Sequence, residues 1–118
     1  MVTYNPCLVL EADSPEALFK ATNKQKLRGK LNRLKEIDEV TFEAFRGEED
    51  LDHWLDEFYE AHIKRWADTP TPSSYIDSSG RSFYKSCILA WIKDGILVRF
   101  AIKLGSRRIA FVTALLEN

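Results

Sequence analysis

The hydrophobic pattern is clearest in the last quarter of the chain. Residues 96–104 and 108–116 are two apolar stretches that contain several β-branched and aromatic residues, and Gly105 and Ser106 lie close to the junction between them. A glycine-serine pair between two such stretches is typical of a tight turn joining paired strands. The sequence therefore predicts an antiparallel hairpin at this end of the chain.

Two earlier stretches also have strand character. Residues 7–11 form a short apolar run bounded by Pro6 and by a polar segment that contains Pro15. Residues 40–46 alternate, with Val40, Phe42 and Ala44 on one side of an extended chain, and end at Gly47. Both stretches predict strands, because alternation and bounding turn residues are the usual marks of β-structure.

Two helices are predicted between these strands. Ser14, Pro15 and Glu16 form a helix start, since serine caps the first amides and proline suits the first helical position. That helix is predicted to end near residues 22–23. A second helix follows to residue 37, because Leu27, Leu31, Leu34 and Ile37 recur at spacings of three and four.

Two more helices are predicted in the middle of the chain. Residues 48–66 carry Leu51, Leu55, Phe58, His62 and Trp66 at helical spacing. After a Pro/Ser-rich loop, residues 82–94 form another helix that ends at Gly95.

The predicted element order is β-αα-β-α-α-β-β. This order indicates one α/β (α+β) domain over residues 1–118, with helices packed on a mixed sheet. Most of the core is expected from the apolar stripes, with the following members: Leu27, Leu31, Leu34, Leu55, Phe58, Trp66, Phe83, Trp91, Phe100 and Phe111.

Composition excludes several classes of protein. The formal net charge is -1, with 45% hydrophobic and 30% charged residues, which is the balance of a globular domain. The basic stretch 20–35 and the acidic stretch 48–60 are interpreted as solvated helix faces, and nucleic acid is not an expected partner. Cys7 and Cys87 lie among apolar neighbours and are interpreted as buried thiols. With no leader-like segment and no long apolar run, the expected location is the cytoplasm, away from membranes.

The last predicted strand has an unguarded edge. Between Ile109 and Leu116 the sequence holds no charge and no proline, the residues that usually blunt an exposed edge. We therefore expect residues 109–116 to pair with the strand near Leu8, to meet further residues of a longer protein, or to form a homodimer through this edge.

Sequence motifs for chemistry are few. No nucleotide-binding glycine motif, zinc motif or nucleophile elbow is present, and no metal site is expected. His53 and His62 lie nine residues apart on one predicted helix and face different directions, and His62 is interpreted as a partly buried, satisfied histidine. The basic helix could bind phosphate through Lys24 and Arg28, and Arg81 and Tyr84 could line a cleft beside the Pro/Ser loop.

The order of these segments is similar to that of a known family. The basic pattern from Lys24 to Leu34, the strand that begins at Val40, and the helix that ends at His62-Ile-Lys-Arg65-Trp66 occur in sequence, followed by a helix with Arg81 near its start and by the hairpin. Over almost the whole chain, this arrangement resembles the BioF2-like, CelD-type acetyltransferase domain of the GNAT superfamily, whose relatives include the FemAB peptidyltransferases.

The resemblance implies a GNAT-like fold and transfer of an acyl group from acetyl-CoA, or another acyl-CoA, to an amine acceptor. In such enzymes a glycine-containing loop at a helix N-terminus, following the central strand, holds the donor pyrophosphate. The chain ends about where that region would begin. We therefore expect residues 1–118 to lack the donor-binding C-terminal half, to hold no cofactor, and to be inactive in isolation.

Candidate contacts to substrate or anion, from the basic positions and the family-like segments, are Lys24, Arg28, His62, Arg65, Arg81 and Tyr84. No catalytic residue follows from the sequence. The alternative function is a non-catalytic binding or assembly module that keeps part of the GNAT-like scaffold.

Overall fold

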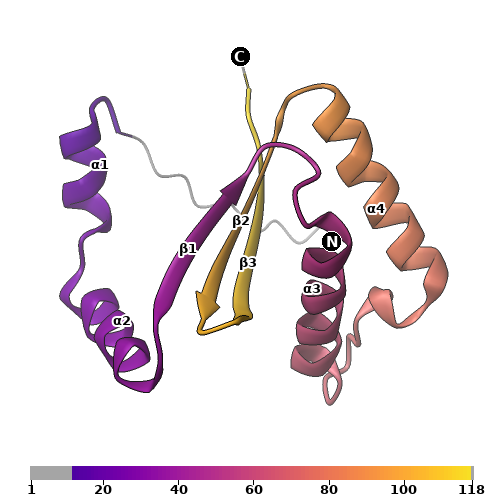
Figure 1. The fold of residues 1–118 in the computed structure, drawn as a ribbon, viewed down its shortest axis with the longest axis horizontal. Coiled ribbons are helices and arrows are strands. Elements are labelled where there is room, and N and C mark those ends of the chain that lie inside the picture. The colour runs from indigo at the N-terminus through magenta and orange to yellow at the C-terminus, as the bar shows by residue number, and fades with distance from the viewer. Residues whose placement is uncertain (1–11, 118) are drawn as a thin grey trace, which may run out of the picture. The chain divides into compact units, whose positions relative to one another are not determined.

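A computed structural model describes residues 12–117 (Figure 1). The strand predicted at residues 7–11, and Cys7 within it, lie outside the described residues. The chain divides into two compact units, Met1–Arg33 and Leu34–Asn118.

The first unit contains a well-capped short helix. Helix α1 (Pro15–Thr22) begins at Ser14, whose Oγ accepts a hydrogen bond from the amide of Ala17 at 3.1 Å. The serine-proline start predicted from the sequence is therefore confirmed. The second helix, α2 (Gln25–Ile37), begins in this unit and ends in the next.

No residue of α1 or α2 is buried. Leu31 and Leu34 are half-buried, but Leu27 is exposed, so its predicted place in the core is wrong. The spacing of the leucines correctly predicted one face of a helix, but spacing alone does not show that this face is buried.

The second unit is built on a three-stranded antiparallel sheet in the order β1 (Val40–Phe45), β2 (Leu97–Leu104) and β3 (Arg107–Leu115). Gly105, with a φ of 63°, turns the chain between β2 and β3 and its amide donates to the carbonyl of Glu39. The predicted hairpin and its antiparallel pairing are confirmed. Within the described residues β3 pairs with β2 alone. Pairing through the other edge, as a homodimer or otherwise, stays a prediction.

The sheet is covered by helices on one face (Figure 1). Helix α3 (Leu51–Trp66) contacts β3, and α4 (Ser78–Lys93) contacts β2. A short 3₁₀ turn, η1 (Ser74–Ile76), links the two helices and packs on both. Helix α4 begins earlier than predicted, and together these elements confirm the mixed α+β class.

The core lies between this sheet face and the two helices. Its buried apolar members are Leu51, Trp54, Leu55, Tyr59, Ile88, Leu97 and Ala101. Three further predicted core residues, Phe58, Trp91 and Phe111, are partly buried and pack against it.

Three core predictions in this unit are wrong. Trp66 is 39% exposed, Phe83 is 73% exposed and Phe100 is 41% exposed. Phe83 misses the core because α4 turns Tyr84 and Ile88 inward instead. Phe100 lies on the opposite face of the sheet from its strand neighbours, since successive side chains alternate.

The inward neighbour of Phe100 is an arginine. Arg99 is fully buried, with its guanidinium carbon 5.1 Å from the ring centre of Phe45 and 5.3 Å from that of Trp54. Its Nη2 donates to the carbonyls of Gly47 and Glu49, and burial lowers the pKa of its guanidinium. Arg99 thus fixes the loop between β1 and α3.

None of the helices within residues 12–117 is both long and apolar enough to cross a membrane.

Candidate functional site

A buried arginine joins three elements around the start of α3. Arg108, on β3, is 5% exposed and forms ion pairs with Glu43 of β1 at 2.7 Å, with Asp50 at 2.8 Å and with Glu57 of α3 at 3.0 Å. Its backbone amide also donates to the second oxygen of Glu57, at 2.9 Å. Hydrogen bonds between charged groups are the stronger kind, so Arg108 anchors α3 to the sheet.

A register shift in the sheet gives Arg108 this orientation. Pairing between β2 and β3 slips after Ile102, so that Lys103 faces Arg108 rather than Ile109. A bulge of this kind redirects a side chain. Arg108 therefore points toward the helices, and Glu43 reaches it from the same face of β1 as the half-buried Phe45.

The contact with Arg108 also determines the role of Asp50. It precedes α3 in a left-handed backbone conformation, with a φ of 50°, which aspartate tolerates better than most residues. Its carboxylate accepts from Arg108 instead of capping the helix. That hydrogen bond holds the pKa of Asp50 below its usual value of 3.8.

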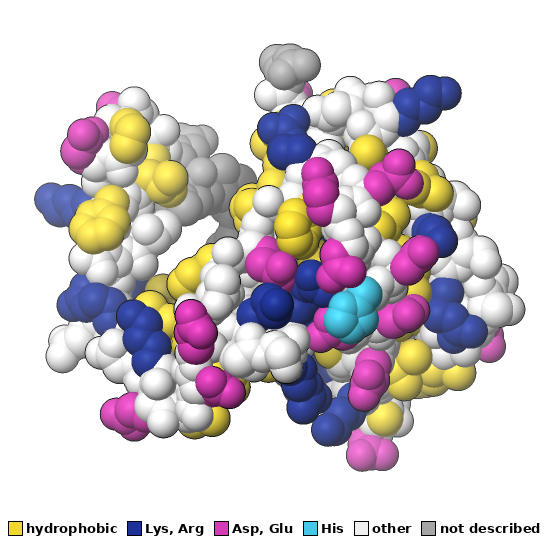
Figure 2. Space-filling model, in the orientation of Figure 1, with side chains coloured by type: hydrophobic (Ala, Val, Ile, Leu, Met, Phe, Trp, Pro, Cys, Tyr) yellow, Lys and Arg dark blue, Asp and Glu magenta, His cyan; other side chains and the backbone are white. Residues whose placement is uncertain are grey.

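His53 lies beside this cluster of charges. Its Nδ1 is 3.4 Å from Asp50 and its Nε2 is 3.3 Å from Glu57. The imidazole is 64% exposed, so it faces solvent as well as the two carboxylates. Figure 2 shows acidic side chains around a histidine on this face, with lysines and arginines among them.

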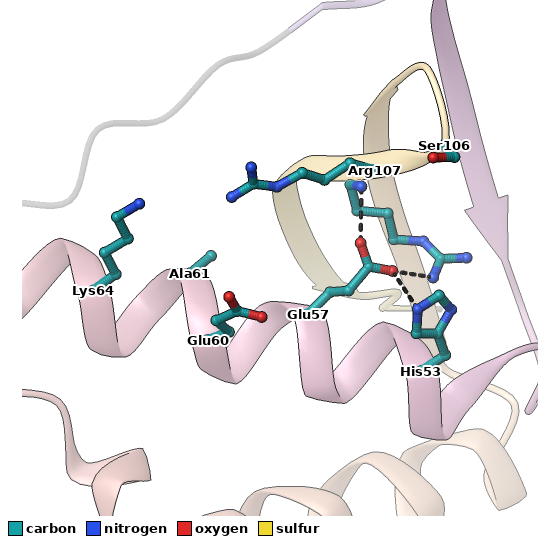
Figure 3. A pocket seen from close by; sticks show the side chains of 8 residues that line it. His53, Glu57, Glu60, Ala61, Lys64, Ser106 and Arg107 are labelled. Carbon is teal, nitrogen blue, oxygen red and sulfur yellow. Dashed lines mark hydrogen bonds and ion pairs between the residues drawn. The ribbon is translucent and has the colours of Figure 1, made fainter.

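A charged pocket of about 250 Å³ adjoins the cluster. Residues 53, 57, 60, 61 and 64 share one face of α3, because they are spaced by three or four. They oppose the end of the hairpin, as Figure 3 shows for the labelled side chains. The pocket is lined by His53, Glu57, Glu60, Ala61, Lys64, Ser106, Arg107 and Arg108.

The charges in this pocket fall into two groups. Glu57 and Arg108 neutralise each other. Glu60, Lys64 and Arg107 are exposed, and within the described part of the chain they have no hydrogen bond or ion pair through their side chains. These three side chains are available to a ligand.

An apolar pocket of about 360 Å³ lies on the next face of α3. It shares Ala61 with the charged pocket, so the two are adjacent along α3 and β3. We call the pair the α3–β3 cleft. The apolar pocket is lined by Phe58, Ala61, His62, Arg65, Trp66, Ile109, Ala110 and Phe111.

Aromatic rings support the floor of the cleft. Phe58 stacks on Trp54 and Tyr84 and meets Phe111 edge-on, with ring centres 5.3 to 5.7 Å apart. Behind it, Tyr59 donates to the carbonyl of Arg81 at 3.0 Å, and burial raises the pKa of Tyr59 to about 12. Phe58 is therefore held by packing on several sides.

Two of the predicted contact residues, His62 and Arg65, lie in the apolar pocket. His62 Nδ1 is 2.8 Å from the hydroxyl of the buried Ser73, and the ring packs against Phe58 and Tyr75. His62 is therefore the partly buried, satisfied histidine that was predicted. Arg65 lies over the ring of Trp66 at 5.7 Å.

Two other candidates, Arg81 and Tyr84, have structural partners. Arg81 Nη1 donates to the carbonyls of Tyr75 and Ile76 at 2.7 and 2.8 Å, which fastens η1 to α4. The Tyr84 hydroxyl is 3.4 Å from that of Thr113, and burial raises the pKa of Tyr84. Neither residue lines the α3–β3 cleft.

The last two candidates, Lys24 and Arg28, belong to the first unit. Arg28 Nη1 donates to the side chain of Asn23 at 2.6 Å. Both residues are exposed. The six candidates are thus distributed over three places, and of these only His62 and Arg65 line the α3–β3 cleft.

The sequence does not predict the charged pocket. Glu57, Glu60 and Lys64 fall within a helix that the sequence predicts, but the acidic stretch 48–60 is interpreted as a solvated helix face and Lys64 is not singled out. The available signal was Arg107-Arg108 directly after a tight turn, at the start of a strand whose remaining residues carry no charge. Charges at a strand start are ordinary in isolation, so only the three-dimensional pairing identifies them.

The loop between β1 and α3 does not fit a pyrophosphate, although it holds a glycine before a helix. The Gly47 amide already donates to the Glu49 carboxylate at 3.0 Å, and the exposed Glu48 adds negative charge. An anion would meet repulsion there in place of free amides. Within residues 12–117 no group of three or more metal-ligating side chains occurs either.

Comparison with known proteins identifies the class. A family model for the acetyltransferase (GNAT) domain matches residues 21–118, which is most of the chain. The chain therefore belongs to the GNAT acetyltransferase domain family. The comparisons with curated proteins and with solved structures gave no match.

Proposed function

We propose that this chain provides the acceptor site of an N-acyltransferase of the BioF2-like, CelD-type branch of the GNAT superfamily, and that the α3–β3 cleft holds the amine acceptor. The family match supports acyl transfer in general. The observation that carries the acceptor assignment is the cleft itself, where the Glu60 carboxylate has no partner among residues 12–117 and an apolar pocket adjoins it through Ala61.

The chemistry of the reaction sets what the cleft must do. In an acyl transfer from a thioester, the acceptor ammonium loses a proton and its nitrogen forms an amide bond with the acyl carbon. The carbon–sulfur bond breaks, the thiol leaves in its protonated form, and one proton is released overall. A carboxylate that binds the ammonium orients its nitrogen, and orientation is a main source of rate in such transfers.

The donor is proposed to be an acyl-CoA, as the resemblance implies. No residue of the described chain is assigned to its pyrophosphate, because the β1–α3 loop does not fit it. The same observation favours the second candidate function, a binding or assembly module that keeps the GNAT scaffold without the chemistry.

One experiment separates these functions. The chain is incubated with benzylamine and with the acetyl thioester of N-acetylcysteamine, a short donor that needs no pyrophosphate site, and the amide product is measured by mass spectrometry. Amide formation faster than without protein, and reduced in Glu60→Gln, supports acyl transfer. No acceleration with this short thioester, which bypasses the pyrophosphate site, would contradict acyl transfer and would favour the binding module.

A further inference from the structure

We infer that the acceptor held in the α3–β3 cleft is a free α-amino acid with an apolar or aromatic side chain. The inference deepens the proposed function and rests on it, because the cleft is taken as its acceptor site. The reasoning starts from the charges that have no partner within the protein.

The charged pocket offers both signs of charge at once. Glu60 provides a negative charge, and Lys64 and Arg107 provide two positive charges, with no partner for any of their side chains among residues 12–117. Figure 3 shows Glu60 and Lys64 on α3 and Arg107 on the hairpin. A ligand that satisfies this set carries a cationic and an anionic group within one small molecule.

The size of the pocket narrows the ligand further. A cavity of about 250 Å³ is smaller than the roughly 300–1,000 Å³ of sites for drug-sized molecules. An ammonium and a carboxylate on the same carbon atom fit such a volume. Arginine binds a carboxylate through two parallel hydrogen bonds, and this makes Arg107 the natural partner for the α-carboxylate.

The adjoining apolar pocket gives the side-chain preference. Ala61 lines both pockets, and beyond it lie Phe111, Trp66 and Ile109. Trp66 and Ile109 are 39% and 38% exposed, so apolar surface remains available there. An apolar side chain of the ligand would bury this surface and so strengthen binding.

The ion pairs of Arg108 with Glu43, Asp50 and Glu57, here called the Arg108 hub, fix one side of the charged pocket. Glu57 is fixed by both the backbone and the guanidinium of Arg108, at 2.9 and 3.0 Å. Glu57 therefore cannot turn to neutralise Lys64 or Arg107. The Arg108 hub thus joins α3 to the hairpin through Glu57 and leaves Glu60, Lys64 and Arg107 to the ligand.

Calorimetry with L-phenylalanine tests the inference directly. L-Phenylalaninamide lacks the carboxylate and N-acetyl-L-phenylalanine lacks the ammonium, so each is expected to bind roughly tenfold more weakly, because each loses charge-assisted hydrogen bonds. L-Alanine, without the apolar side chain, is also expected to bind more weakly. If either analogue binds as tightly as L-phenylalanine, the pocket takes only one charge and the inference is wrong.

Variants of the free charges complete the test. Arg107→Gln and Glu60→Gln are each expected to weaken L-phenylalanine binding roughly tenfold, while Lys93→Gln, a cation in the last turn of α4 away from the cleft, leaves it unchanged. Unchanged binding in both cleft variants would overturn the inference. Circular dichroism checks that each variant folds, which is expected because the altered residues are exposed.

The outcome is distinguishable from failure of the proposed function. If L-phenylalanine binds as expected but no N-acetyl product forms from the short thioester, the acyltransferase proposal fails and the amino-acid site stands. If benzylamine is acetylated while L-phenylalanine does not bind, the amino-acid inference alone fails.

Discussion

Glu57 accepts hydrogen bonds from both the backbone amide and the guanidinium of Arg108, at 2.9 and 3.0 Å. This double contact fastens the first half of α3 to the start of β3. The same guanidinium reaches Glu43 and Asp50, so one buried side chain organises two strands, a loop and a helix. The geometry of the α3–β3 cleft depends on this contact.

Replacing Arg108 with methionine should therefore destabilise the protein strongly. Removing one partner of a buried ion pair leaves the others uncompensated and costs about 3–5 kcal/mol. Urea denaturation measures the loss. The neighbouring Arg107→Met is the matched control, and because Arg107 is exposed it should change the free energy of unfolding by less than about 0.5 kcal/mol.

A second substitution checks the cause of that loss. In the Arg108→Met background, Glu57→Gln removes a carboxylate that has lost its partner and should recover part of the stability. The contrary outcome is that Glu57→Gln lowers the free energy of unfolding by the same amount in the Arg108→Met background as in the unaltered chain. In that case the two residues act independently, and the proposed coupling between Arg108 and Glu57 is wrong.

The ion pair between Asp50 and Arg108 should stabilise the folded chain, and acid should abolish this stabilisation by protonating Asp50. Because Arg108 holds the pKa of Asp50 below 3.8 in the folded chain, the stabilisation is present above that value and is lost as pH falls through the lowered pKa. Denaturation midpoints measured from about pH 5 down to pH 2 should fall less steeply in Asp50→Asn than in the normal chain. Equal slopes of midpoint against pH in the two chains would show that the Asp50–Arg108 contact adds nothing to stability.

Phe58 and Phe83 provide a direct comparison of two phenylalanines that were both predicted in the core. Phe58 packs against Trp54, Tyr84 and Phe111, whereas Phe83 is 73% exposed. Phe58→Ala should cost about 3 kcal/mol, and Phe83→Ala less than about 0.5 kcal/mol. Similar losses for both, in thermal or urea denaturation, would mean that α4 packs through a different face.

This pair also shows what the sequence could and could not predict. The alternation and turn residues of the hairpin, and the serine-proline start of α1, correctly predicted those elements, because local chemistry specifies them. On α4, apolar residues occur around much of the helix, so the periodicity alone did not decide between the faces of Phe83 and Tyr84. The packing of η1 and β2 decides it.

The site was harder to predict than the fold for a related reason. Arg108 lies 51 residues from Glu57 and 65 from Glu43, and nothing in one sequence links them. The bulge after Ile102 that turns Arg108 inward leaves no mark in the hydrophobic pattern. Among the predicted contacts, His62 and Arg65 reach the cleft because they lie on the helix that forms it.

Donor preference provides a further prediction. Because the β1–α3 loop is occupied by its own carboxylates, the chain should bind acetyl-CoA poorly, and acetyl-CoA should be no better a donor than the short thioester of N-acetylcysteamine at equal concentration. The ratio of kcat/KM for the two donors measures this. Micromolar binding of acetyl-CoA by calorimetry would contradict it and would direct attention to Lys24, Arg28 and Arg81.

The most direct test of acceptor binding in the α3–β3 cleft is a titration of the ¹⁵N-labelled chain with L-phenylalanine, followed by two-dimensional NMR. Saturable shifts are predicted for the amides of Ala61, Ser106, Arg107 and Phe111, which line the two pockets, and these shifts should weaken in Glu60→Gln. Shifts that are absent, or that appear on α4 or in the β1–α3 loop while the cleft stays unchanged, would contradict the assignment of the cleft as the acceptor site.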